Sequence, residues 1–154
     1  MAHKSVLKDF AIVGTPLRGL VLRGPFSLCA YLGVPQQHWL ADIDDLEFPC
    51  HWGVTFRQAG DGALWPAGWF WFGWDYGHAG DFIDVPDEIR VLEDLLPPEM
   101  RKMLNGGFLR KGKNWTVEEV EHDLVDAALS LNETLENARL AATQVGNRLK
   151  ASTD

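Results

Sequence analysis

Asp75, His78 and Asp81 follow one another at intervals of three in the sequence, directly after the apolar run WFWFGW. The residues between them include Gly77 and Gly80, which let a backbone approach a ligand closely. A carboxylate beside an imidazole raises the pKa of the ring and fixes its tautomer, as general acid/base catalysis requires. The same side chains can instead hold the polar groups of a bound molecule. The spacing therefore indicates a functional site in this loop.

Two earlier motifs have the same character, because each places histidine and glycine beside a strand-like run. They are YLGVPQQH, which ends at His38, and HWGVTF, which begins at His51. We expect three strand ends to converge at one sheet edge and form a pocket with tryptophan walls and a polar floor. In that pocket His51 and His78 lie close together, and Tyr31 or His38 shares the rim. The candidate ligand-binding residues are Tyr31, His38, His51, Trp52, Thr55, Trp74, Asp75, His78 and Asp81.

A structural interpretation competes with a functional one at each of these positions. Aspartates commonly accept amide hydrogen bonds in turns, and a lone histidine is more often satisfied by backbone carbonyls than by a ligand. We expect the rings of residues 69–76 to divide by strand alternation, some packing the core and others lining the pocket. The coincidence of two aspartates and a histidine in one loop favours a site, because a solvated turn needs no histidine.

A divalent metal is the first alternative to a simple binding site. Acceptable zinc or manganese ligands occur at Cys50, His51, Asp75, His78 and Asp81. The sequence contains no HExxH or HxxEH motif and no CxxC pair, so a metal is not favoured and no cofactor is expected. No serine stands in a nucleophile-elbow motif either. The sequence therefore leaves open whether the protein is an enzyme, and we prefer a non-catalytic role.

The composition is that of an ordinary globular protein. The chain has 154 residues, enough for one domain, of which 46% are hydrophobic and 23% charged. A net charge of −8 argues against general nucleic-acid binding, because backbone phosphates repel an acidic surface. No apolar run approaches the roughly 20 residues of a membrane span, and the N-terminus lacks the apolar core of a signal peptide. With two cysteines, we expect a cytoplasmic protein that does not engage a membrane.

The order of the expected elements is that of an α+β domain. Short apolar runs cut by glycine and proline indicate an antiparallel sheet from the N-terminal half, residues 1–84. A helical insertion over 85–114 and a long C-terminal helix over 116–149 follow. The helix begins with a capping box, in which Thr116 accepts from the amide of Glu119 and Glu119 reaches back. We expect the sheet to pack against this helix within a single domain.

The long helix carries a narrow apolar seam. The seam residues step by alternating threes and fours and are Val117, Val120, Leu124, Ala127, Leu131, Leu135, Ala138, Ala142, Val145 and Leu149. A helix of about 33 residues is roughly 50 Å long, more than the roughly 30–40 Å width of a compact domain of this size. Its far end therefore overhangs, breaks near Asn132 or packs on something else. A monomer with a frayed tail and a homodimer of paired helices both fit, and we expect the homodimer.

The order of these motifs resembles that of a family of small uncharacterised proteins from bacteriophages and prophages. The family motifs are YxGVPxxH, HGGLTF and a tryptophan-rich strand ending in GFDxxHxGD, with a charged C-terminal helix after them. The matching residues here are Tyr31, Gly33, Val34, Pro35, His38, His51, Gly53, Thr55, Phe56, Gly73, Asp75, His78, Gly80 and Asp81. This sequence differs at Trp52, where the family has glycine, and at Trp74, where it has phenylalanine. The resemblance covers about half the chain and implies a phage origin, a bacterial host cytoplasm and a site at these positions.

Three functions fit these observations. The preferred one is a phage protein that binds a small anionic or nucleotide-like ligand and sequesters a nucleotide signal of host defence. Tryptophan and tyrosine rings would stack a base, while histidines and backbone amides would hold phosphate. Positive charge would come from Arg57, Arg110, Lys111 and Lys113. The alternatives are a metal-dependent or acid/base hydrolase of a similar ligand and an adaptor that binds a host protein through the long helix.

Overall fold

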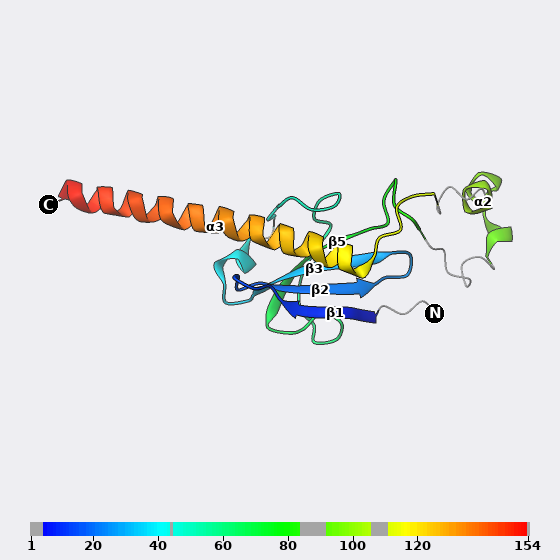
Figure 1. The fold of residues 1–154 in the computed structure, drawn as a ribbon, viewed down its shortest axis with the longest axis horizontal. Coiled ribbons are helices and arrows are strands. Elements are labelled where there is room, and N and C mark those ends of the chain that lie inside the picture. The colour runs from blue at the N-terminus through cyan, green and yellow to red at the C-terminus, as the bar shows by residue number, and fades with distance from the viewer. Residues whose placement is uncertain (1–4, 44, 84–91, 106–110, 154) are drawn as a thin grey trace.

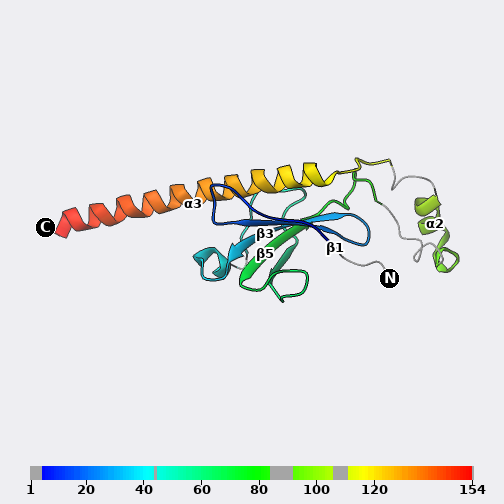
Figure 2. The ribbon, with the colours of Figure 1, turned by 60° about the horizontal axis from the view of Figure 1, so that its bottom comes forward.

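A computed structural model of the chain describes residues 5–43, 45–83, 92–105 and 111–153. Its N-terminal half is a five-stranded antiparallel sheet in the order β1-β2-β3-β5-β4 (Figure 1). The strands are β1 (Ser5–Ala11), β2 (Arg18–Arg23), β3 (Leu28–Pro35), β4 (Phe56–Ala59) and β5 (Trp69–Asp75). The helical elements are η1 (Trp39–Asp42), η2 (Glu93–Leu95), α2 (Pro98–Asn105) and α3 (Val117–Thr153). Because α3 packs on one face of the sheet (Figure 2), the expected α+β fold is confirmed.

Strand alternation divides the aromatic run of β5 between the two faces of the sheet. Trp74 lies on the face that α3 covers, together with Tyr76 just after the strand. Trp71 lies on the opposite face with Tyr31. Gly73 makes room on that second face, because a Cβ atom there would lie 2.4 Å from the ring of Tyr31. The rings therefore pack two apolar faces, and the expected division between core and pocket is wrong for the strand itself.

The first turns of α3 hold the helix against the sheet. The amide of Glu119 donates to Oγ1 of Thr116 at 3.2 Å, and the amide of Thr116 donates to the Glu119 carboxylate at 3.2 Å. These two bonds confirm the expected capping box. The buried residues of the helix are Val120, Leu124, Ala127, Ala128 and Leu131. The first half of the apolar seam is therefore packed on the chain's own sheet.

The second half of α3 extends beyond the sheet (Figure 1). The helix has 37 residues, about 55 Å at 1.5 Å per residue, and it continues through Asn132 without a break. Beyond Leu135 the seam faces solvent, with 54% of Val145 and 63% of Leu149 exposed. The helix therefore overhangs its own sheet, and the expected alternative of a break near Asn132 is wrong.

Two segments differ from expectation or fall partly outside the described chain. The strand-like run HWGVTF is mainly a turn, because Trp52 and Gly53 have φ values of 63° and 82° and β4 begins only at Phe56. The insertion expected over 85–114 is described at 92–105, which include η2 and α2, and at 111–114, and its remainder lies outside the described residues. Within the described ranges, no helix combines the length and apolar character needed to cross a bilayer.

Candidate ligand-binding site

The centre of the candidate site is the carboxylate of Asp81. Among the described residues it is the only buried charged side chain, with 5% of the residue exposed. It accepts hydrogen bonds from Nε2 of His51 at 2.8 Å, from the amide of His78 at 3.0 Å and from Nε1 of Trp115 at 2.9 Å. Burial raises the pKa of Asp81, but these three hydrogen bonds outweigh burial and hold the pKa below its usual value. Asp81 is therefore a buried carboxylate that is ionised at neutral pH.

The chain returns to Asp81 after the insertion. Lys113 forms a parallel bridge with Asp81, and its amide donates to the carbonyl oxygen of Gly80 at 2.8 Å. Gly112 permits this approach, because a Cβ atom there would lie 2.3 Å from the backbone of Asp81. The bridge places Trp115 within hydrogen-bond distance of the carboxylate, directly before the start of α3. The loop after β5 and the start of α3 therefore build the site together.

His51 is held in place by aromatic rings as well as by Asp81. Its ring stacks on Tyr76 with centroids 4.7 Å apart and meets the edge of Trp115 at 5.1 Å. Burial raises the pKa of Tyr76 far above its usual value, so the hydroxyl stays protonated and donates to Asp123 at 2.9 Å. Because Asp81 is ionised, Nε2 of His51 is the nitrogen that donates to it, and in the neutral ring Nδ1 is then the basic atom. This pair can act as a general base with an orienting carboxylate.

The five candidate metal ligands do not form a metal centre. Among the described residues, no three or more His, Cys, Asp or Glu side chains are grouped to hold an ion. Burial raises the pKa of the Cys50 thiol to about 11, so that the sulfur is protonated at neutral pH. Asp81 already accepts from three donors, one of which is His51. The geometry thus gives the metal alternative no support.

His78 and Trp52 form a stacked pair at the surface. Their ring centroids are 5.0 Å apart with the planes at 15°, and 61% of Trp52 is exposed. The φ of 63° at Trp52 is rare for a bulky residue and costs about 1–3 kcal/mol. Nε2 of His78 lies 3.4 Å from Oδ1 of Asp75 without forming a hydrogen bond, so the two form an ion pair only when the ring is protonated. Glycine at this position would adopt the conformation without strain.

A hollow of about 490 Å³ opens beside His78. It is lined by the loop of residues 77–81, by Ile83 and by residues 111–113. Within the described part of the chain, the amides of Ala79 and Gly80 have no hydrogen-bond partner, whereas their neighbours bond inside the loop. The exposed Lys111 adds a positive charge at the rim. The lining of the hollow therefore includes two residues whose amides are unpaired in the described chain, with a cation at its rim.

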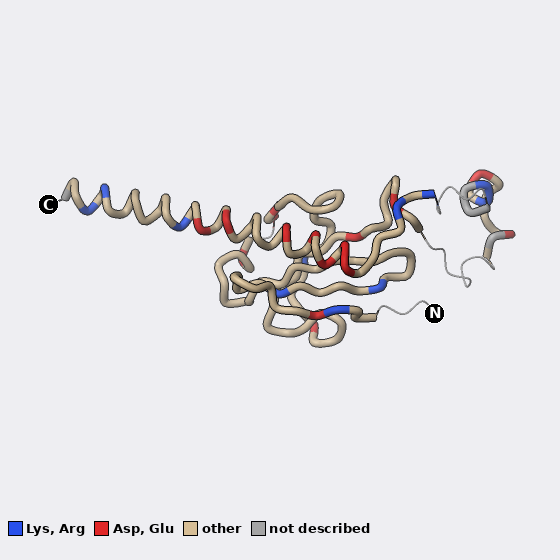
Figure 3. The backbone as a smooth tube through the Cα atoms, viewed as in Figure 1, with Lys and Arg blue, Asp and Glu red and all other residues tan. Residues whose placement is uncertain are grey.

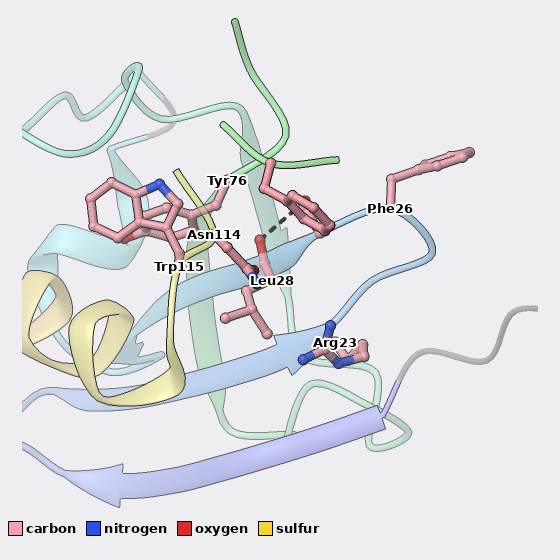
Figure 4. A pocket seen from close by; sticks show the side chains of 8 residues that line it. Arg23, Phe26, Leu28, Tyr76, Asn114 and Trp115 are labelled. Atoms are coloured by element: carbon pink, nitrogen blue, oxygen red, sulfur yellow. Dashed lines mark hydrogen bonds between the residues drawn. The ribbon is translucent and has the colours of Figure 1, made fainter. Parts of the chain in front are cut away.

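A smaller cavity of about 190 Å³ adjoins Tyr76 and Trp115 (Figure 4). It is lined by Arg23, Phe26, Ser27, Leu28, Tyr76, Phe82, Asn114 and Trp115. Figure 4 shows Arg23 entering from the end of β2 and Asn114 from the segment before α3, while the amide of Tyr76 donates to Leu28 at 3.0 Å. The rings of Tyr76 and Trp115 line this cavity and also contact His51 in the Asp81 cluster, which we define as Asp81, His51, His78, Tyr76 and Trp115. Neither His51 nor His78 lines the cavity.

The structure brings together part of the expected site. His51 and His78 lie with ring centroids 6.2 Å apart, as the sequence predicts, and both contact Asp81. The expectation that Tyr31 or His38 shares their rim is wrong. Tyr31 is buried on the opposite face of the sheet, because it faces Gly73 across β3 and β5 rather than Trp74. His38 follows the far end of β3, where its Nδ1 accepts from the amide of Leu40 at 3.2 Å.

Trp74 and Thr55 have structural positions. Trp74 is 1% exposed, and its Nε1 donates to the hydroxyl of Tyr76 at 3.1 Å, so it supports the site from the core and does not line a pocket. The expectation of Trp74 as a wall residue is therefore wrong. Thr55 is exposed beside β5, where its amide donates to the carbonyl oxygen of Gly73 at 2.9 Å. Neither residue contacts His51 or His78 through a described hydrogen bond.

Trp115 is a site residue that the three motifs do not identify. Its place before the capping box indicates only an apolar contact for the helix, whereas its indole N–H donates to Asp81. Tyr76 likewise belongs to the site through its ring, although it stands inside the aromatic run. No motif identifies either residue as part of the site. The general rule that a buried aspartate needs several hydrogen-bond donors indicates only that such donors exist.

Comparison with models of known protein families, with curated proteins and with solved structures found no match to this chain.

Proposed function

We propose that the protein binds a small anionic ligand with a planar ring, such as a nucleotide, beside Trp52 and His78. The observation that carries this proposal is the exposed Trp52, held at a strained φ of 63° and face to face with a histidine that lines the 490 Å³ hollow. Strained backbone and an exposed indole both reduce stability, so they are retained where they serve binding. Stacking a base on such a ring contributes about 1–3 kcal/mol.

The anionic part of the ligand would occupy the hollow next to this stack. It is lined by Ala79 and Gly80, whose amides would donate to the anion, and Lys111 adds a full positive charge. Lys113 contributes less, because its ammonium group lies 2.6 Å from Glu119 and 3.8 Å from the ring of Trp115. A local site of this kind is compatible with a net charge of −8, since short-range hydrogen bonds decide the binding of a phosphate group.

The resemblance to phage proteins gives this proposal a biological setting. A phage protein without a catalytic motif that binds a nucleotide-like molecule would lower the free concentration of that molecule inside the host. We therefore propose sequestration of a nucleotide signal of host defence as the role of the site. Arg57, which the sequence suggested as a further source of charge, instead bonds Glu47 at 2.6 Å. Arg110 lies outside the described residues.

A hydrolase of a similar ligand is the second candidate, because His51 and Asp81 form an oriented general-base pair. Nδ1 of His51 is the basic atom, and the hollow of about 540 Å³ beside it is also lined by Cys50, Asp123 and Ser130. A water molecule in this hollow could lose a proton to Nδ1 as it attacks a bound ester. This candidate needs the ligand to reach His51 as well as His78.

Isothermal titration calorimetry with adenosine monophosphate, cyclic di-adenosine monophosphate, adenosine and inorganic phosphate tests the proposal. We expect at least one of the nucleotides to bind with one ligand per chain. Adenosine and phosphate, which each lack one half of the ligand, should bind at least about 10-fold more weakly, a difference of about 1.4 kcal/mol. Phosphate that binds as tightly as the nucleotides would contradict a role for the stacked pair. The absence of nucleotide binding at millimolar concentration would contradict the proposal as a whole.

The same samples separate binding from hydrolysis. After titration the nucleotide is recovered and its mass is measured. An intact nucleotide supports sequestration, and a cleaved nucleotide supports the hydrolase. His51→Gln should then stop cleavage but retain binding, because glutamine can still donate to Asp81 but has no basic nitrogen.

A further inference from the structure

The C-terminal half of α3 projects from the domain as a bare helix (Figures 1 and 2). Residues 136–153 extend about 27 Å beyond Leu135 at 1.5 Å per residue. An isolated helix of this length is marginally stable in water, because most helix stability in proteins comes from packing of an apolar face. The projecting segment therefore gains stability from a surface that covers it.

The projecting segment keeps the apolar seam of the buried half. Leu135, Ala138, Ala142, Val145 and Leu149 continue the alternating steps of four and three, which is the spacing of a helix pair. Val145 and Leu149 are 54% and 63% exposed. The two alanines in the middle allow a second helix to approach closely. The seam therefore fits another helix better than it fits a flat surface.

The charges along the projecting segment indicate the identity and direction of that helix. Near the domain, Glu133, Glu136 and Arg139 give the helix a net charge of −1, and Arg139 bonds Glu136 at 3.0 Å. Near the tip, Arg148 and Lys150 give it a net charge of +2, so acidic residues gather toward the domain and basic ones toward the tip (Figure 3). A second copy aligned parallel would place glutamates against glutamates and cations against cations. An antiparallel copy centred near Ala142 places Arg148 opposite Glu136 of the second copy, because each lies six residues from the centre. Only the antiparallel arrangement places the net negative base of each helix against the net positive tip of the other.

A hollow at the base of the projecting segment would receive the tip of the second helix. It has a volume of about 430 Å³ and is lined by Pro16, His38, Trp39, Asn132, Leu135, Glu136, Ala138, Arg139 and Ala142. Trp39 is 54% exposed there. In the antiparallel arrangement Leu149 of the second copy lies opposite Leu135, at the edge of this hollow. A stable interface buries about 1,000 Å² or more, and a short helix pair alone buries little more than this. Packing of the helix tip in the hollow would add to the buried area.

We propose that two copies of this chain associate through antiparallel pairing of residues 135–152 of α3, with the tip of each helix packed beside Trp39 of the other copy. This homodimer is independent of the ligand proposed above. It uses only residues outside the Asp81 cluster. It also explains why the helix continues well past the last residue that its own sheet buries.

Multi-angle light scattering of the full chain between about 5 and 200 μM tests the pairing. We expect the wild-type protein to be a dimer, and Val145→Asp with Leu149→Asp to make it a monomer with an unchanged near-UV spectrum. The control is Gln144→Asp with Asn147→Asp, which adds the same charge on the outward side of the helix and should leave the dimer intact. A wild-type monomer at 200 μM overturns the proposal, and so does a dimer that survives the seam variant.

A charge exchange tests the direction. Arg148→Glu with Lys150→Glu should weaken the dimer by about 10-fold or more, because attraction at both ends becomes repulsion. Adding Glu136→Lys restores an opposite charge across from position 148 and should recover most of the lost affinity. In a parallel dimer the first exchange would only replace one like-charge contact with another. An unchanged dissociation constant for the first exchange, or a failure of the second to restore affinity, overturns the antiparallel arrangement.

Discussion

Asp81→Ala is expected to lower the free energy of unfolding by about 3–5 kcal/mol, more than other substitutions in the site. The substitution removes the acceptor for three donors, Nε2 of His51, the amide of His78 and Nε1 of Trp115. Each buried donor left without a partner costs about 1–3 kcal/mol. For a domain of this size the melting temperature should fall by roughly 10 °C or more, as measured by near-UV circular dichroism.

Asp75→Ala is the matched control for this prediction. The side chain of Asp75 is 39% exposed, and it accepts a hydrogen bond from the amide of Gly77 at 3.0 Å. Its loss should change the unfolding free energy by less than about 1 kcal/mol. The pKa of Asp81 in the folded protein lies below the ordinary 3.8. The ionised carboxylate therefore contributes fully to the free energy of unfolding above pH 3.8, and this contribution is lost as the pH falls through the folded pKa. Equal destabilisation by the two substitutions at pH 7 would contradict the central position of Asp81.

Trp52→Ala is expected to weaken nucleotide binding by about 10–100-fold while leaving the melting temperature within about 2 °C of the wild type. The large loss of affinity follows from removal of the stacking surface. The small change in stability follows because 61% of Trp52 is exposed and because its φ of 63° already strains the chain. His78→Ala should have the same pair of effects, since its ring supports the indole. Calorimetry and thermal unfolding of the same preparations measure both quantities.

The chain itself supplies a close control for the Trp52 substitution. Trp39 is 54% exposed and stacks on His38 with centroids 5.8 Å apart and planes at 22°. The two pairs therefore share chemistry and exposure but lie at different places in the fold. Trp39→Ala should leave nucleotide affinity unchanged. If Trp39→Ala weakens binding as much as Trp52→Ala, the effect does not come from the proposed site.

The parts of this fold that could be predicted from the sequence depend on local rules. The capping box at Thr116 and Glu119 satisfies backbone groups that any helix start leaves free, so its pattern is readable without knowledge of the rest of the chain. The strands are punctuated by glycine and proline in the same local way. The proximity of His51 and His78 is a longer inference, and it is correct because both residues adjoin one end of β5.

The positions that the sequence predicts wrongly, Tyr31, His38 and Trp74, depend on the path of the whole chain. β5 lies between β3 and β4, antiparallel to both, so the residues after β3 and those after β5 leave from opposite ends of the sheet. His38 is therefore remote from Asp81 although both follow a strand. Tyr31 and Trp74 were misplaced by a single step of strand alternation, which sends a side chain to the other face. Trp115 lies 34 positions from Asp81 in the sequence, and no local pattern predicts the hydrogen bond between them.

The central claim, that Trp52, His78 and the loop after β5 form one ligand site, is tested most directly by an NMR titration of the isotope-labelled chain. The ligand is the tightest nucleotide found by calorimetry, or adenosine monophosphate at millimolar concentration where calorimetry detects none. The account predicts the largest shifts at the indole N–H of Trp52 and at the amides of Ala79 and Gly80, with the indole N–H of Trp39 unchanged. Shifts confined to other parts of the chain, or none at millimolar nucleotide, would contradict it.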